Sequence, residues 1–153
     1  MPSTTRSEMD FMSQQAPEQP IAVEIPSDPA EARKIQEDIE RQLQASQFSE
    51  KEIFSIKLAL EEALVNAIKH GNQFDRNKKV RIAYMVDRER FDVHISDEGC
   101  GFDPADVPDP TAIENLERPC GRGLMLMRYY MTQVQFSATG NSVSMTKLRN
   151  GTK

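Results

Sequence analysis

Three short motifs, in a fixed order along the chain, carry residue types that could bind and use a nucleotide. In the first motif, residues 61–71, a carboxylate at Glu62 and a carboxamide at Asn66 are one helical turn apart. Side chains at this spacing share one face of a helix, where an acid could take a proton and an amide oxygen could ligate a metal ion. The second motif, residues 97–101, follows a predicted strand with an acid and two glycines. The third, residues 121–124, opens a predicted helix whose amides could receive phosphate.

The composition predicts one acidic domain. The chain has 153 residues and 17.4 kDa, with 38% hydrophobic residues, which suffices for a single core. The net charge of -5 and the pI near 5.1 argue against direct nucleic-acid binding, which depends on clustered Lys and Arg. No segment approaches the roughly 20 apolar residues of a membrane span, and residues 1–10 lack the apolar core of a signal peptide. We therefore expect a cytoplasmic protein that binds neither nucleic acid nor a membrane.

The two cysteines, Cys100 and Cys120, lie at opposite ends of a loop-like stretch. In a cytosolic protein, such thiols are normally reduced. A zinc site that joins them to His70 and His94 is an alternative, but no Cys-x-x-Cys pair and no typical His spacing supports it. The cysteines are better interpreted as small residues beside glycines.

The local patterns divide the chain into a tail and one domain. Residues 1–20 are rich in Ser, Thr, Gln and Pro without periodicity, which predicts an unstructured tail, with docking through Phe11 as the alternative. In the domain, residues 21–148, one helix begins at the cap Asp28 and the next at a capping box of Ser49 and Glu52. Including their caps, the expected elements are an edge strand 21–25, helices 28–46 and 49–71 with Gly71 as a C-cap, strands 80–86 and 91–96, a helix 121–131, and a hairpin of strands 133–138 and 142–148.

The motifs resemble the superfamily of ATP-binding domains shared by gyrase, heat-shock chaperones, histidine kinases and MutL (GHKL). The resemblance covers about residues 21–148 and is specific, because an Asn-bearing helix, an Asp-x-Gly-x-Gly turn and a Gly-x-Gly helix start occur in order. The short length and the Glu-x-x-x-Asn-Ala-x-x-His-Gly helix are most similar to bacterial anti-sigma factor serine kinases of the partner-switching type. The implied fold is a two-layer α/β sandwich of the Bergerat type, with a mixed, mostly antiparallel sheet covered on one face by three helices.

The resemblance implies a role for each motif. Asn66 would ligate a Mg²⁺ ion that also binds ATP phosphates, and Glu62 would be the general base. Asp97 would accept a hydrogen bond from the exocyclic amine of adenine. The other expected ligand contacts are with Gly99 and Gly101 beside the base and with Gly121, Arg122, Gly123 and Leu124 at the phosphates.

Three further positions are assigned less directly by the same resemblance. The proline-containing stretch of residues 103–119 would be a lid over the triphosphate. Either Ser142 or Thr146 would supply a hydroxyl near adenine, and the two remain open. His70 would pack or support the lid rather than take part in catalysis.

The implied function is a kinase that phosphorylates a serine of a small antagonist protein and also sequesters a sigma factor. Homodimers are common in the resembled family, although nothing in the composition demonstrates one here. One alternative is a detached histidine-kinase ATP-binding domain, but the helix of residues 28–46 carries no phospho-acceptor histidine. Another is a non-enzymatic module that binds ATP only to order its lid. Taken singly, Asn66 could be a core amide, Glu62 a solvated acid and Asp97 a turn residue.

Overall fold

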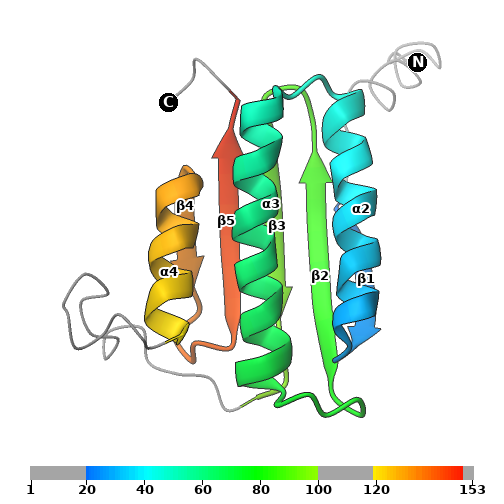
Figure 1. Ribbon diagram of the computed structural model, residues 1–153, viewed down its shortest axis with the longest axis vertical. Helices are drawn as coiled ribbons and strands as arrows, with labels where there is room; N and C mark the ends of the chain where they lie inside the picture. The colour runs from blue at the N-terminus through cyan, green and yellow to red at the C-terminus, as the bar shows by residue number, and fades with distance from the viewer. Residues whose placement is uncertain (1–19, 100–118, 150–153) are drawn as a thin grey trace, which may run out of the picture.

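The computed structural model describes residues 20–99 and 119–149, which form a two-layer α/β sandwich (Figure 1). Helices cover one face of a five-stranded sheet. The predicted tail and lid lie outside these ranges, except for Pro20 and Pro119. In chain order the elements are β1 Ile21–Pro26, α2 Pro29–Ala45, α3 Glu50–Val65, the π-helical segment η1 Asn66–Gly71, β2 Lys79–Val86, β3 Arg90–Ser96, α4 Pro119–Tyr130, β4 Gln133–Phe136 and β5 Ser142–Leu148.

The sheet has the strand order β1-β2-β3-β5-β4, and all four neighbouring pairs are antiparallel. The predicted α/β sandwich is confirmed, with β1 at the edge, but no two neighbouring strands in the described sheet run parallel as a mixed sheet would require. The reason is the connection through α4, which carries the chain from the end of β3 to the far edge of the sheet. Strand β5 then returns between β3 and β4, so these two parallel strands are not neighbours.

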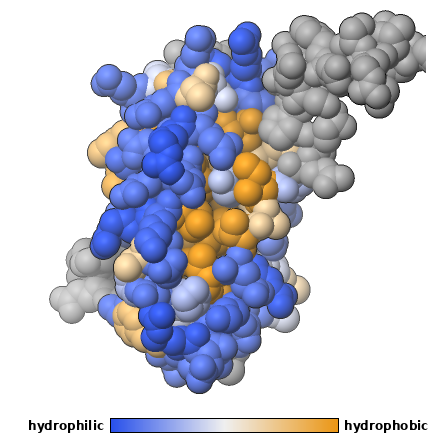
Figure 2. Space-filling model, turned by 90° about the vertical axis from the view of Figure 1, so that its right-hand side faces the viewer, coloured by the Kyte–Doolittle hydropathy of each residue, from blue (hydrophilic) through white to orange (hydrophobic). Residues whose placement is uncertain are grey.

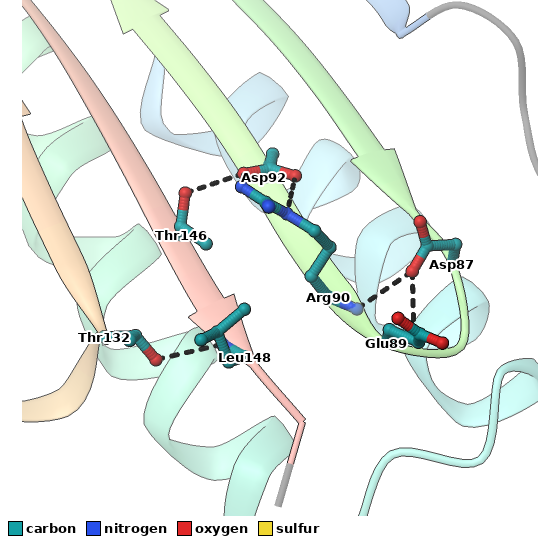
Figure 3. Close-up of polar contacts among 7 residues, drawn as sticks. All are labelled: Asp87, Glu89, Arg90, Asp92, Thr132, Thr146 and Leu148. Atoms are coloured by element: carbon teal, nitrogen blue, oxygen red, sulfur yellow. Dashed lines mark hydrogen bonds and ion pairs between the residues drawn. The ribbon is translucent and has the colours of Figure 1, made fainter. Parts of the chain in front are cut away.

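Alternation along the strands separates an apolar face from a polar one. Val80, Ile82 and Tyr84 of β2 are buried on the side of the helices, where they form the core with apolar side chains of β3 and β5. The other face carries polar contacts between strands. There the Thr146 hydroxyl of β5 donates to the Asp92 carboxylate of β3 at 2.6 Å (Figure 3).

The two long helices begin where their capping residues predict. The Asp28 carboxylate accepts from the Ala30 amide at 2.9 Å, which caps α2. In α3, the Ser49 hydroxyl accepts from the Glu52 amide at 3.1 Å, and the Glu52 carboxylate accepts from the Ser49 amide at 2.8 Å. Four apolar side chains that share one face of this helix are buried: Ile53, Ile56, Leu60 and Leu64.

The second helix does not remain α-helical up to Gly71, as the sequence suggested. It widens at Asn66 into the π-helical segment η1, and Asn72, not Gly71, is its C-cap. The Asn72 amide donates to the Ala67 carbonyl at 2.9 Å, five residues back. The spacing of apolar residues cannot distinguish hydrogen bonds to the fifth preceding residue from the usual bonds to the fourth. Over one turn, both keep the same side chains close to one face of the helix.

Two other predicted boundaries shift by two residues. Helix α4 begins at Pro119 rather than at Gly121. Strand β4 ends at Phe136 rather than at Ala138, because the chain already turns at Ser137, whose carbonyl accepts from the Gly140 amide at 3.0 Å.

An apolar band crosses the side of the molecule where β1 and α2 lie (Figure 2). Ile21 on the edge strand is 40% exposed, and Val23 and Ile35 are only partly buried against the core. The sheet therefore has a partly apolar surface along its β1 edge. Within the described ranges, no helix is both long and apolar enough to cross a membrane.

Replacing Ile56 by Ala tests the packing of α3 against the sheet. Ile56 is 0% exposed, so its truncation should leave a cavity and lower the free energy of unfolding by about 2–5 kcal/mol. Urea denaturation followed by circular dichroism measures the change. As a control on the same helix, Val65→Ala at a side chain 41% exposed should change stability by less than about 0.5 kcal/mol. Equal losses in the two variants would show that the assigned faces of α3 are wrong.

Candidate functional site

A cavity of about 130 Å³ lies where the end of α3, the end of β3 and the β4-β5 hairpin meet. This volume is smaller than the roughly 300–1,000 Å³ of a site that encloses a whole drug-sized ligand, so the cavity could enclose only part of such a ligand. Its lining mixes apolar side chains with a few polar groups: Ala63, Asn66, Ala67, His70, Gly71, Ile95, Asp97, Met127, Phe136, Gly140, Asn141, Ser142 and Val143.

The cavity brings together residues of the first two motifs. Asn66 is the first residue of η1, and Asp97 directly follows the last residue of β3. Ala63 lines the wall together with Asn66, and its small side chain leaves room in the cavity. Residues distant in sequence thus offer an amide and a carboxylate to one space.

Hydrogen bonds fix the position of Asp97. Its backbone N–H donates to the Asn141 carbonyl at 2.9 Å, which joins the end of β3 to the last hairpin. One carboxylate oxygen accepts from the Gly99 amide at 2.8 Å. The other oxygen has no hydrogen-bond partner among the residues that the structure describes. Burial raises the pKa of this carboxyl, against the opposing effects of the Gly99 amide and Lys78.

Two glycines permit a close contact between η1 and the turn after β3. A Cβ at Gly71 would lie 2.4 Å from the carboxylate carbon of Asp97, and a Cβ at Gly99 would lie 2.1 Å from the Gly71 carbonyl oxygen. No side chain fits at either position without displacing its neighbour. Gly71 therefore avoids a clash with the Asp97 carboxylate and is not the helix cap. Gly99 avoids a clash with the Gly71 backbone, in addition to the predicted approach of a base.

Glu62 lies one turn before Asn66 on α3, as expected, but it is not one of the cavity-lining residues. It is partly exposed, and burial followed by the charge of Glu61 raises its pKa. A carboxylate with a raised pKa is a better proton acceptor, which suits a general base beside a cavity.

His70 lies in the cavity wall, although the sequence suggested only packing or lid support. Burial, followed by the charge of Lys69, lowers the pKa of its ring and so favours the neutral form. The signal in the sequence was its position four residues after Asn66, which is itself four residues after Glu62, so that the three side chains share one helix face. No sequence pattern indicated that Phe136 and Asn141 line the cavity, since their positions depend on how the last hairpin packs against the rest of the domain.

The third motif lies in the first turns of α4. The amides of Gly121 and Arg122 fall among the first four of the helix, which lack an acceptor within it, whereas Gly123 and Leu124 lie about one turn inside. Gly101 lies outside the described residues. Of the two hydroxyls left open, Ser142 lines the cavity, and Thr146 instead binds Asp92 on the opposite face of the sheet (Figure 3).

Comparisons with known proteins identify the family. A family model described as histidine kinase-like ATPase domain matches residues 25–147. The serine-protein kinase RsbW of Bacillus subtilis is 35% identical over 107 residues, which cover 65% of this chain and 67% of that protein. RsbW of Listeria monocytogenes is 30% identical over 113 residues, which cover 67% of this chain and 70% of that protein. The chain belongs to the RsbW family of histidine kinase-like ATPase domains.

Membership of the RsbW family confirms the resemblance found in the sequence, and it makes the chain a protein kinase that uses ATP. A crystal structure of the RsbU and RsbW domains of a Mycobacterium tuberculosis protein has the same fold, with a TM-score of 0.58 at 14% identity. The match covers 85% of this chain but only 32% of the larger chain.

Gly71→Ala tests whether the contact between η1 and the turn shapes the site. The new methyl group would push the Asp97 carboxylate away, and losing one hydrogen bond to a charged group should weaken ATP binding roughly 10-fold or more. Isothermal titration calorimetry measures the affinity, and circular dichroism verifies that the variant is folded. Ser144→Ala, on the opposite face of the sheet, is the control and should keep the wild-type affinity. A folded Gly71→Ala variant that binds ATP normally would contradict the placement of the base beside Asp97.

Proposed function

We propose that this chain is an anti-sigma factor serine kinase, which phosphorylates a small antagonist protein and sequesters a sigma factor, exchanging one partner for the other. The observation that carries the proposal is the meeting of Asn66 and Asp97 in one cavity, with Glu62 one turn away on α3. Family membership supports it, since the similar proteins of Bacillus subtilis and Listeria monocytogenes are named serine-protein kinases. The acidic net charge supports protein partners over nucleic acid.

The residues of the cavity fit an adenine nucleotide. Small and apolar side chains such as Ala63 and Ile95 line a space that would suit a flat ring. The second Asp97 oxygen, which has no hydrogen-bond partner among the described residues, would accept from an exocyclic amine. Ser142, which also lines the cavity, would supply a hydroxyl near the same ring. The amides of Gly121 and Arg122 at the start of α4 would then hold phosphate oxygens.

Asn66 fits a magnesium ligand through its side-chain oxygen. In the part of the chain that the structure describes, no three His, Cys, Asp or Glu side chains are grouped to hold a metal ion by themselves. A Mg²⁺ ion at Asn66 would therefore be shared with the nucleotide, as is usual for this hard cation. Mg-ATP, when bound, supplies the phosphoryl group.

The remaining chemistry falls to the protein. Glu62 would accept the proton of the substrate serine hydroxyl as its oxygen bonds to the transferred phosphorus atom, while the bond from that atom to the ADP oxygen breaks. Positioning and charge neutralisation provide most of the rate in such transfers, which explains how a domain of this size could be a complete catalyst.

Glu62→Gln tests the assigned base. Glutamine keeps the shape but cannot accept the proton, so phosphoserine formation should fall roughly 100-fold or more while ATP affinity is kept. The assay incubates purified protein with Mg-ATP and its cognate antagonist and measures phosphoserine. Glu61→Gln, the adjacent acid, should retain transfer within a few-fold. Full transfer by Glu62→Gln would overturn the role of Glu62, and wild-type labelling of a histidine would overturn the serine kinase itself.

The pH dependence of transfer gives an independent test. Transfer should rise with pH as Glu62 loses its proton, because only the carboxylate is a base. The charge of Glu61 adds to burial in raising the pKa of Glu62, so Glu61→Gln should move the acid limb of kcat/KM to lower pH. Glu50→Gln at the far end of α3 is the control and should leave the limb in place. An unmoved limb in Glu61→Gln would mean that another group titrates.

The same pKa shift makes a prediction for stability. A carboxyl whose pKa is raised on folding stabilises the folded state below the unfolded pKa, and this contribution is lost as pH rises through the folded pKa. At neutral pH, Glu62→Gln should therefore unfold at a higher temperature than the wild type, and at low pH the difference should shrink. Thermal scans at several pH values measure it, and a lower unfolding temperature at neutral pH would contradict burial as the cause of the shift.

A further inference from the structure

We infer that Asn72 is a positioning residue whose buried side-chain amide holds the turn of residues 97–99 and thereby sets the preference of the cavity for adenine. Asn72 follows η1 and is not among the cavity-lining residues. Any effect on a ligand must therefore pass through the groups it holds. The inference rests on the proposed function, because it takes Asp97 as the group that meets the base.

The side chain of Asn72 is 0% exposed and fully engaged. Its Nδ2 donates to the Ser27 hydroxyl at 2.9 Å and to the Lys79 carbonyl at 3.0 Å, and its Oδ1 accepts from the Glu98 amide at 2.8 Å. A buried amide is costly unless it is hydrogen-bonded, and here both of its ends are. The surroundings of residue 72 therefore match both the donor and the acceptor of a side-chain amide.

The backbone of Asn72 is held as firmly as its side chain. Its N–H donates to the Ala67 carbonyl near the start of η1, and its carbonyl accepts from the Asp75 amide, both at 2.9 Å. The Ser27 hydroxyl continues the network by donating to the Lys78 carbonyl at 2.7 Å. One residue thus connects η1, the junction between β1 and α2, the start of β2 and the turn after β3.

The hydrogen bond from the Glu98 amide connects Asn72 to the cavity, because Glu98 is next to the cavity-lining Asp97. The Glu98 amide belongs to the peptide group directly after Asp97, so Asn72 holds that peptide in place. The peptide before Asp97 is held from the other side by the Asn141 carbonyl. Because both flanking peptides are fixed, the Asp97 carboxylate points in a defined direction. It can therefore discriminate between bases by the hydrogen-bonding group that they present to it.

Only a carboxamide meets these demands at this position. An aspartate of the same shape would accept from Glu98 but would set an oxygen against the Lys79 carbonyl oxygen, where Nδ2 now donates. A leucine would leave both backbone groups without their partner. Asn72→Asp is therefore the variant that keeps the volume and removes the donors.

The experiment compares the affinities of the full-length chain for ATP and GTP by isothermal titration calorimetry. Asn72→Asp should lower the ATP-to-GTP affinity ratio roughly 10-fold, through the ATP affinity. In an Asp97→Asn background the same change should have little further effect, because residues acting through one group are not additive. Asn77→Asp, at an exposed asparagine, matches the change in charge and should keep the wild-type ratio.

The outcomes separate a positioning role from a structural one. A structural role would lower the unfolding temperature while the folded protein kept its ATP-to-GTP ratio, and that result, or additive effects with Asp97→Asn, would overturn the inference. If Asn72→Asp does not fold, Ser27→Ala removes a single acceptor and should lower the same ratio by a smaller factor; an unchanged ratio would then overturn the inference. A wild-type chain without a preference for ATP would overturn the proposed place of the base together with this inference.

Discussion

The structure of the site depends on one close contact between two stretches of backbone. The end of η1 approaches the turn after β3 so tightly that a methyl group at Gly71 or Gly99 would collide with the other segment. This approach sets the carboxylate of Asp97 beside the helix that carries Asn66, although the two residues belong to different layers of the sandwich. The π-helical widening occurs at the same place, where the helix must end against the turn.

Burial of the acidic side chains Asp97 and Glu62 lowers the stability of the fold. Burial raises the pKa of both Asp97 and Glu62, which means that their charged forms are less favourable in the folded protein than in water. The apolar core between the helices and the sheet offsets this cost, with side chains such as Leu60, Ile82 and Phe91 fully or almost fully buried. Burial of the site's charges thus destabilises the fold, and burial of the adjacent apolar core stabilises it.

The sequence predicted the elements of the fold because their signals are local. The cap at Asp28, the capping box at Ser49 and the alternation in β2 each depend on residues a few positions apart. The place of β5 between β3 and β4 depends on the whole sheet, and no local pattern encodes it. Asn72 could not be predicted for the same reason. An asparagine after a glycine is typical of a turn, and the importance of Asn72 depends on its hydrogen bonds to residues 27, 79 and 98, which only the fold brings together.

The strand order also determines when the pocket can first exist during synthesis. The carbonyl that anchors the Asp97 amide comes from Asn141, and β5 is the last strand among the residues that the structure describes. A nascent chain that has emerged only as far as α4 therefore has the helix that carries Asn66 but lacks the hairpin residues that line the cavity. A polypeptide truncated before the last hairpin would therefore lack one wall of the cavity, which Phe136, Gly140, Asn141, Ser142 and Val143 form.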